Sequence, residues 1–208
     1  MDKLKLTYFD FSGGRAEPAR LALHLGGIPF EDYRFGPADF AAVKKTTPLG
    51  QVPTLHINDL QVTQSDAITR YAGKLAGLYP ESPLQALLCD EVMGALEDVV
   101  NKIGATFGLT GDDLRSARAP LVTEVFPRYL RWLEAQLERQ GGEYFADSRL
   151  TVADLKAFVV LRWIASGKLD HVPADLIDTV APKLKSYVER IAALPAIARH
   201  YGVAGAAK

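Results

Sequence analysis

The pattern of apolar and polar residues changes near residue 80 of this 208-residue chain. Before that point, short alternating segments typical of half-buried strands are interleaved with short amphipathic segments typical of helices. A helical crossover between the first two strands would make them parallel, and Asn58-Asp59 predicts a two-residue hairpin between the last two. The predicted strands are residues 4–9, 30–35, 54–57 and 60–63, and the predicted helices are residues 15–25, 38–46 and 65–78.

From residue 84 onward the chain is predicted to be helical. Residues 84–103 and 122–137 each keep one apolar face at helical spacing. Pro127 is expected to kink the second of these helices, because proline lacks the amide N–H of the helical ladder. We therefore predict an α/β domain at residues 1–78 and an all-α domain at residues 84–208.

Local sequence marks two more helix starts. Thr151 is a good N-cap and Asp154 stands three residues later, which predicts a capping box with aspartate in place of the usual glutamate or glutamine. Pro182 suits the first turn of a further helix. Both features concern folding rather than chemistry.

The composition narrows the class of protein. The chain is 48% hydrophobic and its net charge is −1, so nothing favours a nucleic acid or an anionic membrane as a partner. No stretch approaches the roughly 20 apolar residues that span a bilayer. The charged start, Met1-Asp2-Lys3, lacks the apolar run of a secretory signal. We expect a soluble, cytoplasmic protein.

Cysteine and histidine usage limits the chemistry further. Cys89 is the only cysteine, which excludes an intrachain disulfide and a C-x-x-C redox motif. Its place in a periodic helical segment predicts a buried side chain. The four histidines are scattered without an i,i+4 pair, so no metal site is expected. The sequence also lacks the G-x-G-x-x-G and G-x-S-x-G motifs.

Three segments in the first third of the chain carry groups that suit a small, anionic, peptide-like thiol. Tyr8 offers a phenol near the end of a strand, Gln51-Val52-Pro53 places an X-Pro bond before a strand, and Gln64-Ser65-Asp66 places a hydroxyl at a helix start. A thiol with a pKa of about 8.5 is mostly protonated at neutral pH. A phenolic O–H binds the thiolate more strongly than the thiol. Taken alone, Tyr8 is more simply explained as a strand tyrosine that only packs against its neighbours.

In this order and spacing, these segments resemble those of the cytosolic glutathione transferases, and among the classes the sigma class most. The resemblance implies a thioredoxin-like α/β domain that binds glutathione and an all-α domain that supplies the pocket for an electrophile. The motifs that carry it are Leu4-Lys5-Leu6-Thr7-Tyr8-Phe9, Gly14-Arg15-Ala16-Glu17, Gln51-Val52-Pro53, Gln64-Ser65-Asp66-Ala67-Ile68 and Thr151-Val152-Ala153-Asp154.

The resemblance implies that Tyr8 stabilises the glutathione thiolate and that Arg15 is the assisting cation. Lowering the pKa of the thiol by two units requires about 2.7 kcal/mol. One charge-assisted hydrogen bond, of about 1.5–3 kcal/mol, together with a cation could supply it. The predicted helix puts Arg15 in its first turn, where the macrodipole disfavours positive charge, so a functional role is expected. The alternative is a surface arginine near Glu17.

The resemblance also assigns the two ends of glutathione. It implies a cis Val52–Pro53 bond whose preceding backbone pairs with the cysteinyl unit, with Gln51 alongside. Gln64 and Ser65 are expected at the γ-glutamyl end; simple helix capping by Ser65 is the alternative.

The glycyl carboxylate is expected to contact Lys44, with Lys45 as a substitute. Phe40 stands where sigma members commonly carry a tryptophan, and phenylalanine cannot donate a hydrogen bond. Weaker recognition of the glycyl end, or a substitute donor, is expected. Asp98 is expected to reach the γ-glutamyl amine of a neighbouring subunit in a homodimer, or else to be a solvated acid.

The electrophile pocket is expected to be lined by Phe9, Phe11, Phe107 and Tyr201. The leading interpretation is a detoxifying transferase that conjugates glutathione to small hydrophobic electrophiles. A glutathione-dependent isomerase or peroxidase, or a non-catalytic ligand-binding or crystallin-like relative, is the alternative. Some sigma members that isomerise prostaglandins carry a tryptophan in the segment matching residues 104–106, which is Gly-Ala-Thr here. This difference argues against a specialised prostaglandin D synthase.

Overall fold

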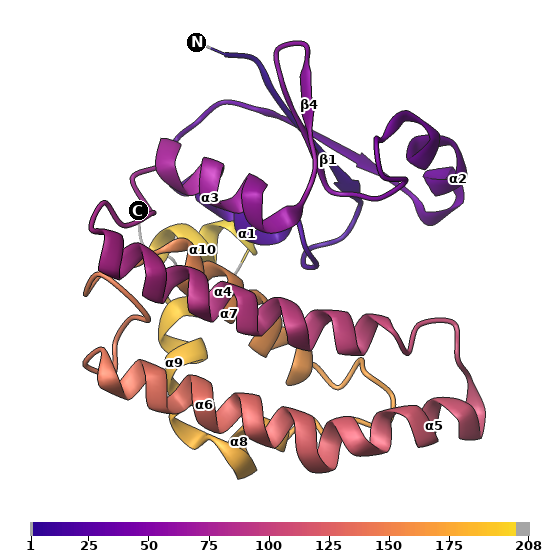
Figure 1. The fold of residues 1–208 in the computed structure, drawn as a ribbon, viewed down its shortest axis with the longest axis vertical. Helices are drawn as coiled ribbons and strands as arrows, with labels where there is room; N and C mark the ends of the chain where they lie inside the picture. The colour runs from indigo at the N-terminus through magenta and orange to yellow at the C-terminus, as the bar shows by residue number, and fades with distance from the viewer. Residues whose placement is uncertain (1, 203–208) are drawn as a thin grey trace.

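Four strands form one mixed sheet in the computed structural model, which describes residues 2–202 (Figure 1). β1 (Leu4–Phe9) lies between β2 (Glu31–Phe35) and β3 (Thr54–Ile57), and β4 (Leu60–Val62) is the edge strand beside β3. β1 and β2 are parallel, while β3 is antiparallel to both β1 and β4. Asn58 has φ +53°, as a tight hairpin turn requires. The predicted crossover and hairpin are confirmed.

The helices of the α/β part separate the sheet from the rest of the chain. α1 (Glu17–Leu25) and α3 (Ser65–Leu75) pack against each other between the sheet and the helical part (Figure 1). The helix predicted at residues 38–46 is broken into three pieces. α2 (Phe40–Val43) is flanked by the 3₁₀ turns Pro37–Asp39 and Lys44–Thr46.

The helix start predicted at Arg15 is wrong by two residues. α1 begins at Glu17, with Pro18 in its first turn, and Arg15 precedes it. Gly13 and Gly14, at φ +138° and +69°, reverse the chain after β1. Arg15 is therefore a loop residue outside the first turn of the helix, and the argument from the macrodipole does not apply to it.

A long helical hairpin follows. α4 (Pro83–Gly104) is succeeded by α5 (Gly111–Pro120), a π-helical segment at Leu121–Val125, and α6 (Phe126–Arg139). The sequence analysis missed α5. The distortion expected at Pro127 appears one turn earlier, as the π segment, because the ring nitrogen cannot donate to the carbonyl four residues before it.

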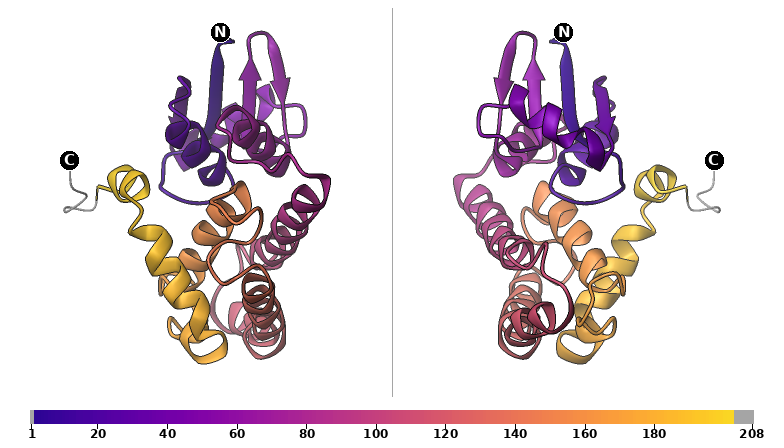
Figure 2. Two further views of the ribbon diagram at one scale, coloured as in Figure 1. Left: turned by 90° about the vertical axis from the view of Figure 1, so that its left-hand side faces the viewer. Right: turned by 90° about the vertical axis from the view of Figure 1, so that its right-hand side faces the viewer.

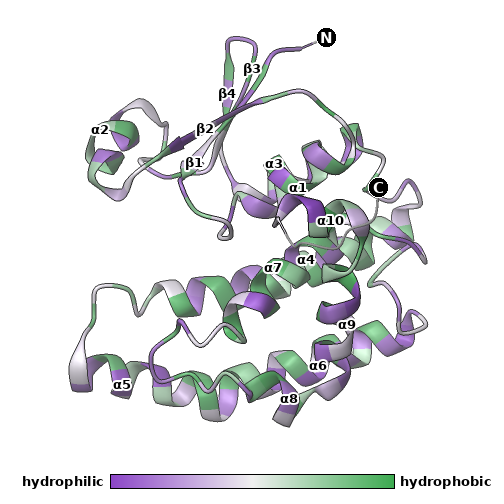
Figure 3. Ribbon diagram, turned by 180° about the vertical axis from the view of Figure 1, so that it is seen from behind, coloured by the Kyte–Doolittle hydropathy of each residue, from purple (hydrophilic) through white to green (hydrophobic). Residues whose placement is uncertain are grey.

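α7 (Val152–Ile164) is the central helix of this part, with eleven of its thirteen residues buried. It lies between α4 and the pair formed by α9 (Pro182–Ala192) and α10 (Pro195–His200), as the side views show (Figure 2). α8 (Leu176–Val180) lies between α7 and α9 in the sequence. Apolar residues extend along most of α7 (Figure 3), and its buried face also contacts α1 and α3. This contact joins the α/β part to the helical part.

The predicted capping box at the start of α7 is confirmed. Oδ2 of Asp154 accepts hydrogen bonds from the backbone N–H and the hydroxyl of Thr151, both at 2.8 Å. Oδ1 accepts from the Phe145 backbone N–H and the Tyr187 hydroxyl, both at 3.0 Å. All of these groups are buried, so the carboxylate fixes the position of the helix that joins the two parts.

Candidate functional site

Tyr8 lies on β1 with its ring buried and its hydroxyl at the loop that follows the strand. The phenol oxygen accepts a hydrogen bond from the backbone N–H of Arg15 at 3.1 Å. The O–H itself is therefore left to donate to another group. A phenol that accepts one hydrogen bond becomes a better donor in the next, because bonds in a chain polarise one another.

Burial keeps this phenol neutral. Desolvation raises the pKa of Tyr8 above its ordinary value of about 10, although the hydrogen bond from the Arg15 backbone and the charge of its guanidinium oppose the rise. Tyr8 thus carries its proton at physiological pH and can act as a donor to an anion.

Gly14 lets the loop approach the phenol. A Cβ at this position would lie 2.6 Å from the Tyr8 hydroxyl oxygen and 2.9 Å from its Cε1. The backbone there also has φ +69°, which side-chain-bearing residues rarely adopt. Only glycine therefore allows the Arg15 N–H to reach Tyr8 in this way.

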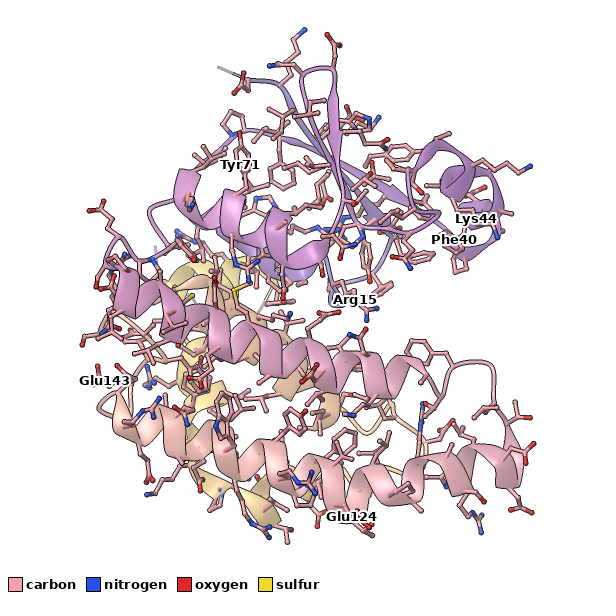
Figure 4. The ribbon with its side chains drawn as sticks, viewed as in Figure 1. Arg15, Phe40, Lys44, Tyr71, Glu124 and Glu143 are labelled. Atoms are coloured by element: carbon pink, nitrogen blue, oxygen red, sulfur yellow. The ribbon has the colours of Figure 1, made fainter. Side chains whose placement is uncertain are left out.

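Four charged residues form a network beside Tyr8. The Arg15 guanidinium donates to Oε1 of Glu97 at 2.9 Å, and Oε2 of Glu97 accepts from the Lys156 ammonium at 2.9 Å. Lys156 also donates to Asp66 at 2.5 Å. Arg15 makes a further hydrogen bond of 2.7 Å to Asn101 (Figure 4 shows Arg15 between the α/β part and α4). The network therefore ties together the Tyr8 loop, α3, α4 and α7.

The network also favours the ionised form of Glu97. Burial opposes ionisation of Glu97, but the ammonium of Lys156 and the guanidinium of Arg15 outweigh it, so the pKa of Glu97 is lowered. Lys156 itself is 5% exposed. An ammonium this buried is stable only because it has two carboxylate partners.

A cavity of about 570 Å³ lies between the α/β part and the helical part, with Tyr8 and Arg15 in its wall. Of the expected electrophile residues, Phe11, Phe107 and Tyr201 line it. Trp163 adds an indole from α7, with its ring 6.2 Å from that of Phe107. A tryptophan is therefore present in this cavity, although it does not come from residues 104–106.

Phe9 does not line this cavity. Its ring packs against Phe35 at 4.8 Å and Phe40 at 5.1 Å, away from the helical part. The reason is strand geometry, since successive side chains on β1 point to opposite faces of the sheet. The cavity wall uses Tyr8, so its neighbour Phe9 faces the other way.

Phe40 and Lys44 lie together on and after α2, outside the cavity lining (Figure 4). The Lys44 ammonium is 6.0 Å from the centre of the Phe40 ring, and no acidic partner within residues 2–202 pairs with it. Gln51 is exposed and also lies outside the cavity. Lys44 and Gln51 are thus exposed on the α/β part, whereas Phe40 is half-buried against Phe9.

The Val52–Pro53 peptide bond is cis, as predicted. Among residues 2–202, neither the N–H nor the C=O of Val52 takes part in a backbone hydrogen bond outside the strands. An extended peptide needs such unpaired groups in order to add to the sheet.

α3 begins at Ser65, with Gln64 as its N-cap residue and no side chain capping its N-terminus. Gln64 has φ +72°, an uncommon backbone conformation for a residue other than glycine. The Ser65 hydroxyl and the first N–H groups of α3 are left for another acceptor or anion. Ser65 and Asp66 line the cavity, whereas Gln64 is exposed beside it.

Asp98 is exposed on α4 and accepts a hydrogen bond from the Tyr129 hydroxyl at 3.1 Å. It does not line the cavity of its own chain, in contrast to its neighbour Glu97. A contact between Asp98 and this site would therefore have to come from a second subunit.

The sequence analysis missed Lys156, Arg162 and Trp163 as residues of the site. All three lie on α7, whose sequence reads as nearly continuous apolar residues. Lys156 could have revealed the site from the sequence, because a charged residue within a helix that is apolar on all sides requires a buried partner.

Cys89 is buried as predicted, and burial raises the pKa of its thiol to about 12. Residues 2–202 hold no cluster of three histidine, cysteine or acidic side chains suited to a metal ion. Within the same residues, no helix has the length and apolarity to cross a bilayer.

Comparison with known proteins agrees with this architecture along most of the chain. Residues 4–74 match the family described as "Glutathione S-transferase, N-terminal domain", and residues 97–202 match "Glutathione S-transferase, C-terminal domain". The predicted thioredoxin-like α/β layer followed by an all-α part is thereby confirmed. The boundaries at residues 1–78 and 84–208 stay predictions.

Individual relatives also match this chain along most of its length. Glutathione S-transferase 3 of Caenorhabditis elegans is 32% identical over 197 residues, covering 92% of this chain and 91% of the relative. The structure of prostaglandin synthase D of Nilaparvata lugens superposes with a TM-score of 0.85 at 30% identity, covering 97% of this chain and 98% of that one. The sigma class transferase of Fasciola hepatica superposes with a TM-score of 0.83 at 27% identity, covering 100% and 98%. The chain therefore belongs to the glutathione S-transferase family and is sigma-like within it.

Proposed function

We propose that this chain is a transferase that ionises the thiol of glutathione at Tyr8 and conjugates it to small hydrophobic electrophiles. Tyr8 donates its O–H to the sulfur and stabilises the thiolate. The Arg15 guanidinium adds a positive charge nearby. The thiolate then attacks an electrophilic carbon in the cavity, a C–S bond forms, the leaving group departs, and the thiol proton goes to solvent.

The rest of glutathione is proposed to lie along the open surface of the α/β part. The unpaired backbone of Val52 would hold the cysteinyl unit as an added strand, with Gln51 beside it. Gln64, Ser65 and the N-terminus of α3 would hold the γ-glutamyl carboxylate.

Lys44 would hold the glycyl carboxylate, with Phe40 giving only an apolar contact. Lys44 contributes as a point charge, which gives less directional recognition than a donor pair. We therefore expect modest affinity at this end.

We further propose that the enzyme is a cytoplasmic homodimer that serves detoxification. Asp98 of one subunit would approach the γ-glutamyl amine bound to the other. Its exposure on α4, outside the cavity of its own chain, supports this arrangement.

The observation that carries the proposal is the Tyr8 phenol, neutral by burial, oriented by the Arg15 backbone N–H and facing a cavity with an apolar wall. The test is retention on immobilised glutathione followed by turnover of a generic aryl halide. A protein that is retained and turns over supports a transferase. A protein that is retained but does not turn over the aryl halide is either a binding protein or the isomerase or peroxidase considered below, and the proposal then fails.

A glutathione-dependent isomerase is the second candidate, because relatives with this fold include proteins named prostaglandin synthase or prostaglandin D synthase. The same thiolate would serve an isomerase or a peroxidase. Turnover of an endoperoxide or hydroperoxide at a rate well above that of aryl halides would favour this candidate.

A further inference from the structure

The cavity wall carries more positive than negative charge. Its cationic residues are Arg15, Lys156, Arg162 and Lys168, and its acidic residues are Asp66 and Glu97. The wall is thus net +2, while the whole chain is net −1. A cavity whose charge opposes that of its protein attracts anions by its local field.

The two acids are already neutralised by the two cations near Tyr8. Asp66 pairs with Lys156, and Glu97 pairs with both Lys156 and Arg15. The excess positive charge therefore resides on Arg162 of α7 and on Lys168 just after it. Neither of these two has an acidic partner within 4.0 Å among residues 2–202.

Arg162 is held in place by aromatic rings rather than by an acid. Its guanidinium lies 4.2 Å from the centre of the Tyr201 ring and 5.2 Å from that of Phe158. Stacking occupies the faces of the guanidinium and leaves the in-plane N–H donors at its edge available. A carboxylate is the group that accepts two such donors side by side.

Arg162 is exposed at a cavity whose lining also includes apolar side chains. These are Trp163, Val159, Val160 and Phe107. A ligand that fills the cavity would therefore place an apolar body against these residues and a negative group against Arg162, with Lys168 as a second cation in the wall.

We infer that the preferred electrophiles are apolar molecules that bear a carboxylate or sulfonate remote from the reacting carbon, and that Arg162 is the residue that selects them. This inference rests on the proposed transferase function and names its substrate class. Arg162 acts on the substrate's anionic group and takes no part in ionising the thiol.

A matched pair of substrates tests the inference: 4-chloro-3,5-dinitrobenzoate and its methyl ester. In both, the thiolate forms a bond to the ring carbon that bears chlorine, and chloride leaves. The ratio of kcat/KM for the acid to that for the ester isolates the contribution of the carboxylate. The nitro groups activate both rings, but the ester group withdraws electrons more strongly than the carboxylate does, so the ratio in the enzyme is corrected by the ratio of the uncatalysed rates with glutathione.

Arg162→Gln is expected to lower the corrected acid-to-ester ratio about fivefold to tenfold, the range of a partly exposed ion pair with hydrogen bonds. The ester should lose less of its rate than the acid, and the KM for glutathione should stay the same. Arg162→Lys should retain part of the preference. Arg131→Gln, an exposed arginine of α6 outside the cavity, is the matched control. The acid rate should also fall with added salt more than the ester rate.

The inference would be overturned if Arg162→Gln left the corrected acid-to-ester ratio unchanged, that is, if both substrates lost the same factor in kcat/KM. Binding of the two preformed glutathione conjugates, measured by calorimetry, reports the same preference without turnover. Absence of turnover with both substrates would contradict the proposed function, whereas turnover and binding without an acid preference would contradict this inference alone.

Discussion

The hydroxyl oxygen of Tyr8 accepts the backbone N–H of Arg15 at 3.1 Å, so one residue supplies both a hydrogen bond that orients the phenol and a side-chain cation beside it. The Arg15 guanidinium is in turn held by Glu97 and Asn101. The donor and the cation are therefore positioned by contacts that exist before any ligand binds. Such preorganisation avoids the cost of orienting them during the reaction.

Replacing Tyr8 by phenylalanine should slow conjugation about 10–100-fold while leaving the KM for glutathione nearly unchanged, because the hydrogen bond to the sulfur is lost while the other proposed contacts to glutathione remain. The variant also removes the acceptor of the Arg15 backbone N–H. Steady-state kinetics with an aryl halide measure this. Tyr33→Phe, at an exposed tyrosine on β2, is the control and should behave as wild type. An unchanged rate in Tyr8→Phe would remove Tyr8 from its assigned role.

Gly14→Ala should impair the enzyme even though Tyr8 is intact. The added Cβ would lie 2.6 Å from the phenol oxygen, so the ring or the loop must move. Gly13→Ala is the matched control, because it also has positive φ but meets nothing closer than 3.8 Å. We expect kcat to fall roughly tenfold more for Gly14→Ala, as misplacement of a catalytic group would cause. Equal losses in the two variants would show that only backbone strain matters.

Lys156→Met should destabilise the protein at neutral pH by about 1–3 kcal/mol, since it leaves Asp66 and Glu97 partly buried without their shared ammonium. The penalty should shrink in acid, because Lys156 helps to lower the pKa of Glu97 and this stabilisation is lost as the pH falls through the folded pKa of that carboxyl. Urea unfolding at neutral and at acidic pH measures it.

Lys185→Met removes a lysine–aspartate pair of 2.8 Å at an exposed site and is expected to have little effect. If both lysine variants lost the same stability, burial would not be the source of the Lys156 effect.

Glu17 should make the protein sensitive to acid. Burial opposes its ionisation, but the hydrogen bond from His200 and the charge of Arg20 outweigh burial and lower its pKa from 4.5 to about 2. A carboxyl whose pKa is depressed on folding contributes its stability above the unfolded pKa and loses it as the pH falls from about 4.5 to about 2. The contribution is about 3 kcal/mol. Glu17→Gln should flatten the pH dependence of urea unfolding in this range, and an unchanged slope would rule this contribution out.

The features that could be predicted from the sequence are local ones. The hairpin at Asn58 and the capping box of Thr151 and Asp154 each depend on a few neighbouring residues, and the structure contains both. The cis bond before Pro53 was expected from the resemblance to the glutathione transferases, and the structure contains it too. Short-range rules of turns, caps and strand alternation govern such features.

The charged network around Lys156 escaped prediction because it depends on residues far apart in the chain. Lys156 meets Asp66 and Glu97 across 90 and 59 positions of sequence, and no local pattern contains that pairing. The position of Arg15 before α1 was missed because the loop geometry depends on the two preceding glycines. Phe9 could have been excluded from the cavity by strand alternation, given that Tyr8 was placed in it.

The most direct test is an ultraviolet titration of the thiolate of glutathione bound to the wild-type enzyme. If Tyr8 and Arg15 act as proposed, the bound sulfur should be half ionised about two units below the pKa of about 8.5 of a free thiol. In Tyr8→Phe the midpoint should move back toward the free value. A bound sulfur that still carries its proton well above pH 8 in the wild-type enzyme would contradict the account.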